Sequence, residues 1–381
     1  MIYLDNNATT QLAPEVAEAM QPFLGPAYGN PSSAHSIGRD ARAAVDSSRE
    51  SVAELLGAND ANEIVFTSGG TESDNWAILG ALELHPDKRH IVTTVVEHEA
   101  IRKLFEKLEK KGYEVTWLGV DGDGLLDLSE VGSVISDDTA VVSVMMANNE
   151  TGVLFPVKEI GQIVRSRSNA LFHVDGVNAA GKILIDLKNT EIDLFSISAH
   201  KFHGPKGVGA LYVRNGVDLP SMSIGGGQES GRRAGTEAVH QIAGIGAAAK
   251  FVTDLSKTRS VAGLRDRLED SILDGVPNTS VNGTRDSGKR LPNTTNISFE
   301  NTNGEMILFR LDDAGICVST GSACNSSDHS ASPVLTAMNI PYSRAMGSIR
   351  FSLGRFNTSD EISKVLNILP EIVADLRRMA G

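Results

Sequence analysis

Short apolar runs rich in β-branched residues alternate with longer helix-periodic stretches between about residues 60 and 215. This alternation is typical of a parallel β-sheet covered by helices. Apolar residues recur at helical intervals in two of the intervening stretches, residues 101–111 and 157–167. We therefore expect an α/β fold whose large domain holds a mainly parallel seven-stranded sheet between helices. The predicted strands are residues 63–67, 91–96, 114–118, 139–146, 171–174, 192–197 and 208–213.

The pattern changes after the helix that we predict over residues 236–255. The chain becomes more polar, and a stretch rich in Pro, Asn, Gly and Thr, residues 275–295, interrupts the alternation of strands and helices. Residues 359–379 carry the apolar stripe of an amphipathic helix, which Pro370 is expected to kink or split. The predicted domains are a large domain over residues 16–255 and a smaller α+β domain formed by residues 1–15 and 256–381.

Composition narrows the classes of function. The chain has 381 residues, of which 41% are hydrophobic and 22% are charged, as expected for a globular protein with two cores. Its net charge of −13 argues against binding to long nucleic acids, although a local basic pocket for a small anion is compatible with it. The two cysteines are too few for a disulfide scaffold or a thiolate zinc site, and they fit a reducing compartment. With no secretory or membrane-spanning pattern, we expect a cytoplasmic protein that binds no membrane.

Polar residues follow the predicted strands, at the sheet edge where open parallel sheets bind ligands. The segment from Thr67 to Thr71 contains Gly69 and Gly70, whose backbone could approach a phosphate, and Thr71 would open a helix with its positive dipole end toward that anion. Residues 71–74 also resemble a capping box. The alternative is an ordinary structural turn between a strand and a helix.

Two charged residues at strand ends suggest a covalent cofactor. Asp175 ends an apolar strand, so it should face a cation or a metal, unless it only caps the turn that follows. Lys201 follows the next strand, where a lysine near other cations or apolar walls can act as a nucleophilic amine rather than a solvated charge. A phosphate cradle, a carboxylate and an amine match the phosphate, ring nitrogen and aldehyde of pyridoxal phosphate. His98 could stack on the ring, or it could be a structural histidine.

A different interpretation is a metal-dependent enzyme. Imidazole and carboxylate groups are ligands that suit zinc or iron. The candidate ligands would be His98, His173, Asp175, His200 and His203.

Several motifs along nearly the whole chain point to one family. They are residues 3–10 (Tyr-Leu-Asp-Asn-Asn-Ala-Thr-Thr), 29–33, 67–75, 147–152, 198–201, 232–236, 321–324 (Gly-Ser-Ala-Cys) and 349–352. In these motifs the sequence resembles the cysteine desulfurases of the NifS/IscS group, which are pyridoxal-phosphate enzymes of fold type I in the class V aminotransferase branch. The resemblance implies an enzyme that converts L-cysteine to L-alanine and transfers the sulfur to one of its own cysteines as a persulfide.

The resemblance also implies roles for individual residues. Lys201 would form the covalent link to the cofactor, Asp175 would pair with the ring nitrogen, and His98 would stack on the ring and assist proton transfer. Cys324 would be the sulfur-accepting nucleophile. The remaining expected contacts are Gly70, Thr71, Ser198 and His200 for the phosphate, Thr236 for the phosphate of a second subunit, Asn149 for cofactor and substrate, and Arg350 for the substrate carboxylate. Asn178 stands where the family usually has a glutamine that contacts the ring hydroxyl, so this hydrogen bond should be weaker or run through water.

The two cysteines are expected to differ in environment and partners. Cys324 lies among small polar residues that favour an exposed loop, whereas Cys317 lies in an apolar run and should be a small buried hydrophobic residue. The family implies a homodimer that supplies sulfur for iron-sulfur clusters or related thiolation, with a sulfur-acceptor protein such as an iron-sulfur scaffold. Selenocysteine lyase activity is the nearest alternative within the enzyme class, and a carrier or scaffold subunit without turnover is a non-catalytic one.

Overall fold

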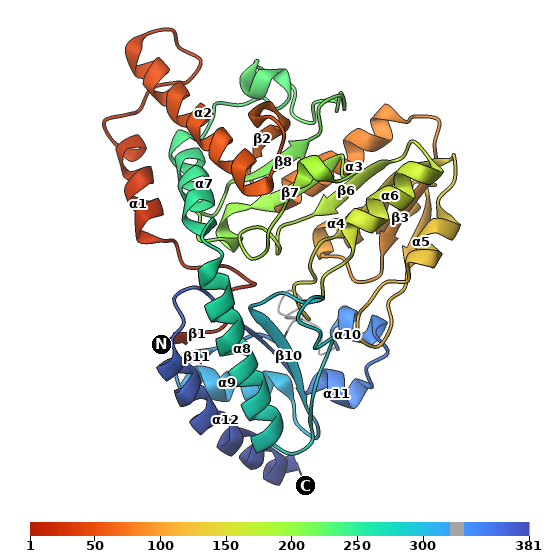
Figure 1. The fold of residues 1–381 in the computed structure, drawn as a ribbon, viewed down its shortest axis with the longest axis vertical. Helices are drawn as coiled ribbons and strands as arrows, with labels where there is room; N and C mark the ends of the chain where they lie inside the picture. The colour runs from red at the N-terminus through yellow and green to blue at the C-terminus, as the bar shows by residue number, and fades with distance from the viewer. Residues whose placement is uncertain (321–330, 381) are drawn as a thin grey trace.

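A computed structural model describes residues 1–320 and 331–380 of the chain. Figure 1 shows a larger part built around a central sheet and a smaller part that contains both chain termini. The helix α7 (Val239–Val252) belongs to the larger part, and α8 (Ser256–Gly275) continues from it into the smaller part. No helix in the described ranges has an apolar stretch long enough to cross a bilayer.

The central sheet has seven strands in the order β2-β8-β7-β6-β5-β3-β4. They are β2 (Ile64–Thr67), β3 (His90–Thr94), β4 (Glu114–Leu118), β5 (Thr139–Met145), β6 (Leu171–Asp175), β7 (Leu194–Ser198) and β8 (Gly209–Val213). All neighbouring strands pair in parallel except β8, which is antiparallel to both β2 and β7. The predicted mainly parallel α/β sheet is therefore confirmed, with strand ends that shift by one or two residues.

Helices cover both faces of this sheet because alternate strand residues point to opposite sides. On β7, Phe195 and Ile197 join the hydrophobic cluster formed with α2, α6 and α7, whereas Leu194 joins the cluster formed with α3 and α4. The helices of the larger part, besides α7, are α1 (Pro14–Met20), α2 (Ser36–Leu56), α3 (Gly70–Leu84), α4 (Glu99–Glu109), α5 (Leu128–Val134) and α6 (Val157–Arg167). The prediction for α6 is confirmed at both ends, and α4 begins two residues earlier than predicted because His98 caps it.

The smaller part has its own hydrophobic cluster. Ile2 and Leu4 from the start of the chain pack there with residues of α8, β10 and α12. Its strands are β1 (Ile2–Tyr3), β9 (Thr279–Val281), β10 (Thr294–Phe299), β11 (Ile316–Cys317) and β12 (Ser348–Ser352), and its remaining helices are α9 (Gly304–Asp313), α10 (Pro333–Ala337), α11 (Tyr342–Met346) and α12 (Ser359–Ala380). The order β12-β10-β9 forms an antiparallel sheet, and β1 pairs in parallel with β11. The division into domains at residues 15 and 255 stays a prediction.

The C-terminal helix corrects one expectation. Pro370 lies inside α12, which runs from Ser359 to Ala380 as one helix, so proline does not split it, and the predicted kink stays a prediction. Proline removes one backbone hydrogen bond and crowds the preceding turn. The apolar stripe on both sides of it is buried, with Val365, Leu369 and Val373 fully enclosed, and this packing outweighs the local cost.

A buried ion pair fixes the loop that carries Thr236. Arg49 of α2 donates to both carboxylate oxygens of Glu229 at 2.6 and 2.7 Å. The backbone N–H of Phe66 on β2 also donates to Glu229 Oε2, at 2.9 Å. The loop is therefore fastened to a helix and to an edge strand of the central sheet.

Candidate active site

A cavity of about 370 Å³ opens beyond the carboxyl ends of β3, β5, β6 and β7, where the two parts of the molecule meet. Residues from the larger part, the N-terminal segment and β12 line it. The predicted site residues found in its wall are Gly70, Thr71, His98, Asn149, Asp175, Asn178, Ser198, His200, Lys201 and Arg350. Thr236 is exposed and does not line this cavity, and Cys324 lies outside the described residues.

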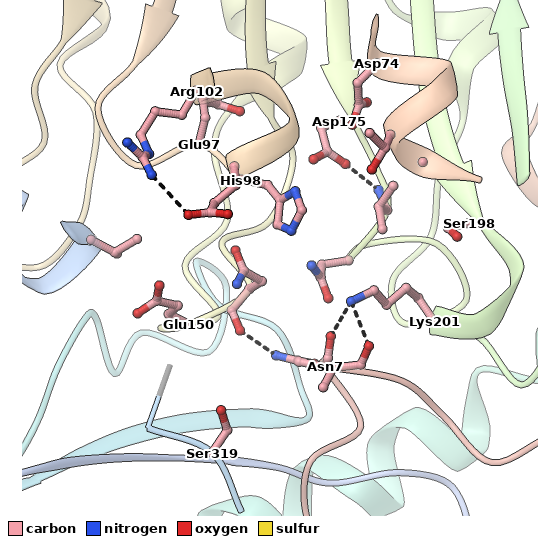
Figure 2. A pocket seen from close by; sticks show the side chains of 18 of the residues that line it. Asn7, Asp74, Glu97, His98, Arg102, Glu150, Asp175, Ser198, Lys201 and Ser319 are labelled. Atoms are coloured by element: carbon pink, nitrogen blue, oxygen red, sulfur yellow. Dashed lines mark hydrogen bonds and ion pairs between the residues drawn. The ribbon is translucent and has the colours of Figure 1, made fainter. Parts of the chain in front are cut away.

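Lys201 points into the cavity from the turn that follows β7. It ends a short 3₁₀ segment, Ala199–Lys201, which sets the side chain just beyond the strand. Its Nζ donates to the backbone oxygens of Asn7 at 2.5 Å and Ala8 at 3.1 Å (Figure 2). The amine is thus held over the cavity by carbonyl groups.

Asp175 ends β6 beside the strand that leads to Lys201. Its Oδ1 accepts a hydrogen bond of 2.9 Å from the backbone N–H of Val177, so the expected turn-capping contact exists. Burial raises the pKa of Asp175, while the positive charges of His98 and Lys201 act in the opposite direction. The carboxyl therefore caps the turn and also faces cationic groups, so both interpretations of the sequence apply.

Two further buried carboxyls, which sequence reasoning missed, lie near Asp175 (Figure 2). Burial raises the pKa of Glu97 to about 8, although its Oε1 accepts from Thr94 Oγ1 at 2.7 Å and from the backbone N–H of Met145 at 3.0 Å. Burial, followed by the charge of Asp175, raises the pKa of Asp74 well above its usual range. Both groups therefore favour the protonated, neutral form, whereas at Asp175 the positive charge of Lys201 acts against the effect of burial.

His98 has a structural role that also fixes its tautomer. It is the N-cap residue of α4, and its Nδ1 accepts the backbone N–H of Ala100 at 3.2 Å. Burial lowers the pKa of His98, which favours the neutral ring. Because Nδ1 is an acceptor, the proton of the neutral ring lies on Nε2. The expected stacking on a cofactor ring stays a prediction.

The start of α3 presents unpaired backbone N–H groups, and the predicted phosphate cradle there stays a prediction. Gly70 and Thr71 are the first residues of the helix, so their N–H groups have no carbonyl partner within it. A Cβ at Gly70 would lie 2.7 Å from Val177 Cγ2, which explains why glycine is required there. The predicted capping box at residues 71–74 is wrong, since the N-cap is Gly69, and Glu72 instead accepts the N–H of Ser68 at 2.8 Å.

The guanidinium of Arg350 closes the opposite side of the cavity. Arg350 lies on β12 and is only 4% exposed. Its Nη1 donates to the backbone oxygen of Asn149 at 3.0 Å, and its Nη2 donates to Asp5 Oδ1 at 2.6 Å. The expected neighbours Arg350 and Asn149 are therefore in contact, through the backbone of Asn149.

Asn7 is a second feature that sequence reasoning missed. Its side-chain oxygen accepts from Lys182 Nζ at 3.0 Å and from Asn293 at 3.1 Å, and its amide nitrogen donates to the backbone oxygen of Asn149 at 3.0 Å. Lys182 also lies 3.4 Å from Asn178 Oδ1. The polar residues Asp5, Asn6 and Asn7 directly after a short apolar run were the available signal, but they do not reveal partners so distant in sequence.

The proposed metal ligands do not gather in one place. His173 is enclosed between Ser143 Oγ and Ser196 Oγ, each at 2.9 Å, and burial lowers its pKa to about 3. His203 instead contacts the backbone oxygen of Gln11 at 2.9 Å. Residues 1–320 and 331–380 contain no group of three His, Cys, Asp or Glu side chains that could hold a metal. The geometry therefore gives the metal-dependent interpretation no support.

Cys317 lies in β11, but the prediction that it is buried is wrong. The thiol is partly exposed, and its Sγ lies 4.0 Å from Asp312 Oδ1. β11 has only two residues and pairs with the equally short β1, so this strand buries less of its side chains than a central strand would.

Comparisons with known proteins extend over the whole chain. Residues 2–365 match the family described as Aminotransferase class-V. The cysteine desulfurase of Trichormus azollae is 52% identical over 382 residues, which cover 100% of this chain and 94% of that protein. A solved NifS-like protein has a TM-score of 0.91 at 38% identity and covers 98% of this chain and 100% of its own. The structure of SspA in complex with cysteine has a TM-score of 0.83 at 33% identity, over 94% of this chain and 100% of that one.

The buried carboxyl of Glu97 predicts a pH-dependent stability. Its folded pKa of about 8 lies above the ordinary value of 4.5, so its stabilising contribution is fully present below pH 4.5 and is lost as pH rises through 8. The variant Glu97→Gln has a neutral side chain at this position at every pH and keeps an oxygen acceptor. We expect the free energy of unfolding of the variant, relative to wild type, to rise by on the order of a few kcal/mol between pH 5 and pH 8.

Urea unfolding at several pH values would measure this difference. Glu72→Gln is the matched control, because the pKa of Glu72 is lowered and its contribution is lost only on the acid side. Its difference from wild type should therefore stay constant between pH 6 and 8. Parallel pH profiles for Glu97→Gln and wild type would show that Glu97 is ionised in the folded protein.

Proposed function

This chain belongs to the class-V aminotransferase family, among its NifS-like cysteine desulfurases, and from this premise we propose how its residues convert L-cysteine to L-alanine. The observation that carries the proposal is the single cavity into which Lys201, Asp175 and Arg350 all project. An amine, a buried carboxyl and a guanidinium at these three places suit an amino-acid substrate handled on a pyridoxal cofactor.

Pyridoxal phosphate is the cofactor that the family implies, and the residues present fit it. When bound, this group supplies an aldehyde that bonds an amine and a protonated ring that accepts electrons. The cradle at α3, the carboxyl of Asp175 and the amine of Lys201 line one cavity and match its three polar ends. We assign the phosphate to Gly70, Thr71, Ser198 and His200, the ring nitrogen to Asp175, the ring face to His98, the ring hydroxyl to Asn178 and the aldehyde to Lys201.

The side chains around the cavity bind the substrate and assist the movement of its protons. Arg350 and Asn149 bind the α-carboxylate of L-cysteine, and Lys201 Nζ removes the α-proton. His98 carries its proton on Nε2, since its ring is neutral and Nδ1 is engaged, so it can donate a hydrogen bond from Nε2 to a reacting atom and assist proton transfer there. Glu97 and Asp74 favour their neutral state. The positive charge of Lys201 opposes the effect of burial on Asp175, the carboxyl that we assign to the protonated ring nitrogen.

We assign the sulfur acceptor to Cys324. Its thiolate attacks the substrate sulfur, an S–S bond forms, and the bond between that sulfur and the substrate Cβ breaks. The electron pair of the broken bond stays with the carbon part, which takes up a proton and becomes L-alanine, so no external oxidant or reductant is needed. Ser319 and Pro333, which precede and follow the segment that contains Cys324, both line the cavity, and this supports the assignment.

We further propose a cytoplasmic homodimer that passes its persulfide sulfur to an acceptor such as an iron-sulfur scaffold. Thr236 is exposed on a loop that also carries Met222 and Ile224, and Ile224 is 95% exposed. An apolar side chain so open to water is typical of an interface. In the dimer, Thr236 would contact the cofactor phosphate of the second subunit. The two-cysteine composition supports a reducing compartment.

The covalent link to the cofactor tests the assignment of Lys201. Borohydride reduction of the purified enzyme, followed by peptide mass spectrometry, should place the reduced pyridoxal adduct on Lys201. In Lys201→Ala the adduct should be absent, because the amine that forms the bond is gone. Lys206→Ala removes an exposed lysine five positions away and should keep the adduct. An unchanged adduct on another lysine, such as Lys182, would overturn the assignment.

Turnover tests the assignment of Cys324. We expect Cys324→Ser to lower alanine production from L-cysteine by at least about a hundredfold, because a hydroxyl cannot accept the sulfur as a persulfide. The visible absorbance of the bound cofactor should persist, which shows that the cavity is intact. Cys317→Ser is the matched control and should retain activity. Wild-type rates of alanine release in Cys324→Ser would refute the nucleophile, and the same assay with selenocysteine compares the two substrates.

A further inference from the structure

Arg350, the residue assigned to the substrate carboxylate, is already paired with a carboxylate of this chain. Its Nη2 lies 2.6 Å from Asp5 Oδ1, and the side chains are 5% and 20% exposed. Both groups are thus largely withdrawn from water, where a charge pair is only weakly screened. Asn7 and Glu150, which are labelled in Figure 2, line the same cavity as Arg350.

The backbone fixes Asp5 beside Arg350. Asp5 follows β1 and forms a parallel bridge with Ser352 of β12, two residues beyond Arg350. The backbone N–H of Ser352 donates to Leu4 O at 2.8 Å, and the N–H of Asn6 donates to Ser352 O at 3.0 Å. Because both chain neighbours of Asp5 are fastened to β12, its backbone is held beside Arg350.

The other charged groups near Arg350 do not replace Asp5 as its counterion. Burial raises the pKa of Glu150, which favours its neutral form, and its Oε2 accepts from Ser332 Oγ at 2.5 Å. Lys182 is a second basic group, whose pKa is lowered by burial and by the nearby Lys201 and Arg350. A buried guanidinium without a partner is strongly unfavourable, so Asp5 provides the charge that stabilises Arg350.

The guanidinium still has a free donor for a ligand. Nη1 and Nη2 each carry two N–H groups, and the bonds to the backbone oxygen of Asn149 and to Asp5 Oδ1 use one on each, whereas Nε is buried away from solvent. A substrate carboxylate that binds here therefore shares Arg350 with the carboxylate of Asp5. Two anions on one guanidinium repel each other, and each weakens the hold of the other.

We propose that Asp5 competes with the substrate's α-carboxylate for Arg350 and thereby sets how tightly the site holds amino acids. The proposal rests on the assigned role of Arg350 in carboxylate binding. It gives Asp5 two effects: it stabilises Arg350 in the free enzyme, and it weakens the retention of the product L-alanine. Asp5 is then a specificity-determining residue, which acts on ligands with a carboxylate and not on ligands without one.

The test compares two ligands in the charge-neutral variant Asp5→Asn of the cofactor-loaded enzyme. We expect the dissociation constant of L-alanine, followed by the absorbance of the bound cofactor, to fall about tenfold when the repulsion between the carboxylates is removed. Cysteamine, which is cysteine without its carboxylate, should keep its dissociation constant. The KM for L-cysteine should fall together with the dissociation constant of L-alanine. The variant Asp5→Glu retains the charge and should bind alanine as wild type does.

Further controls separate this effect from general damage. Asp312→Asn removes an exposed carboxyl that contacts Cys317 Sγ, and it should leave alanine binding unchanged. Asp5→Ser is a second neutral variant for the case in which Asp5→Asn does not fold. Unchanged or weaker alanine binding in a folded neutral variant would overturn the proposal, as would an equal gain for alanine and cysteamine. If wild type releases no alanine from L-cysteine, the proposed function itself fails instead.

Discussion

Adjacent parallel strands end at the same edge of a sheet, and the site depends on this constraint. β6 ends at Asp175 and β7 leads to Lys201, so the carboxyl and the amine meet in one cavity without any special loop. The N-terminal segment then crosses this edge, and its carbonyl groups hold the lysine amine. Arg350 lies on β12, in the smaller part of the molecule. Regular backbone pairing fixes the position of each of these side chains, and rigid elements hold reacting groups more precisely than loops do.

Several ionisable groups lie in the cavity away from water. Burial favours the neutral form of some of them, and ion pairs stabilise the charge of others. Glu97 and Asp74 favour the protonated state, so they add no negative charge to the cavity. Arg350 is paired with Asp5, and the positive charge of Lys201 opposes the rise that burial causes in the pKa of Asp175. Placing a carboxylate between basic groups favours its charged form, and this is the electrostatic requirement for holding a protonated ring nitrogen.

The local pattern of the sequence was enough for the sheet and for much of the cavity wall. Apolar strands with polar endings predicted Asp175, Lys201 and the cradle at Gly70, because these depend on residues close in sequence. The contacts of Asp5 and Asn7 join residues that lie 142 to 345 positions apart in the sequence, and no local pattern carries that information. The partly exposed Cys317 and the unbroken α12 likewise depend on tertiary packing rather than on the residues nearby.

A crystal structure of the purified enzyme, grown without added substrate, tests the central claim most directly. The account predicts continuous electron density from Lys201 Nζ into a pyridoxal ring, with the ring nitrogen within hydrogen-bonding distance of Asp175 and the phosphate at the start of α3. A ring bound elsewhere, or a ring in this cavity whose nitrogen faces away from Asp175, would contradict it.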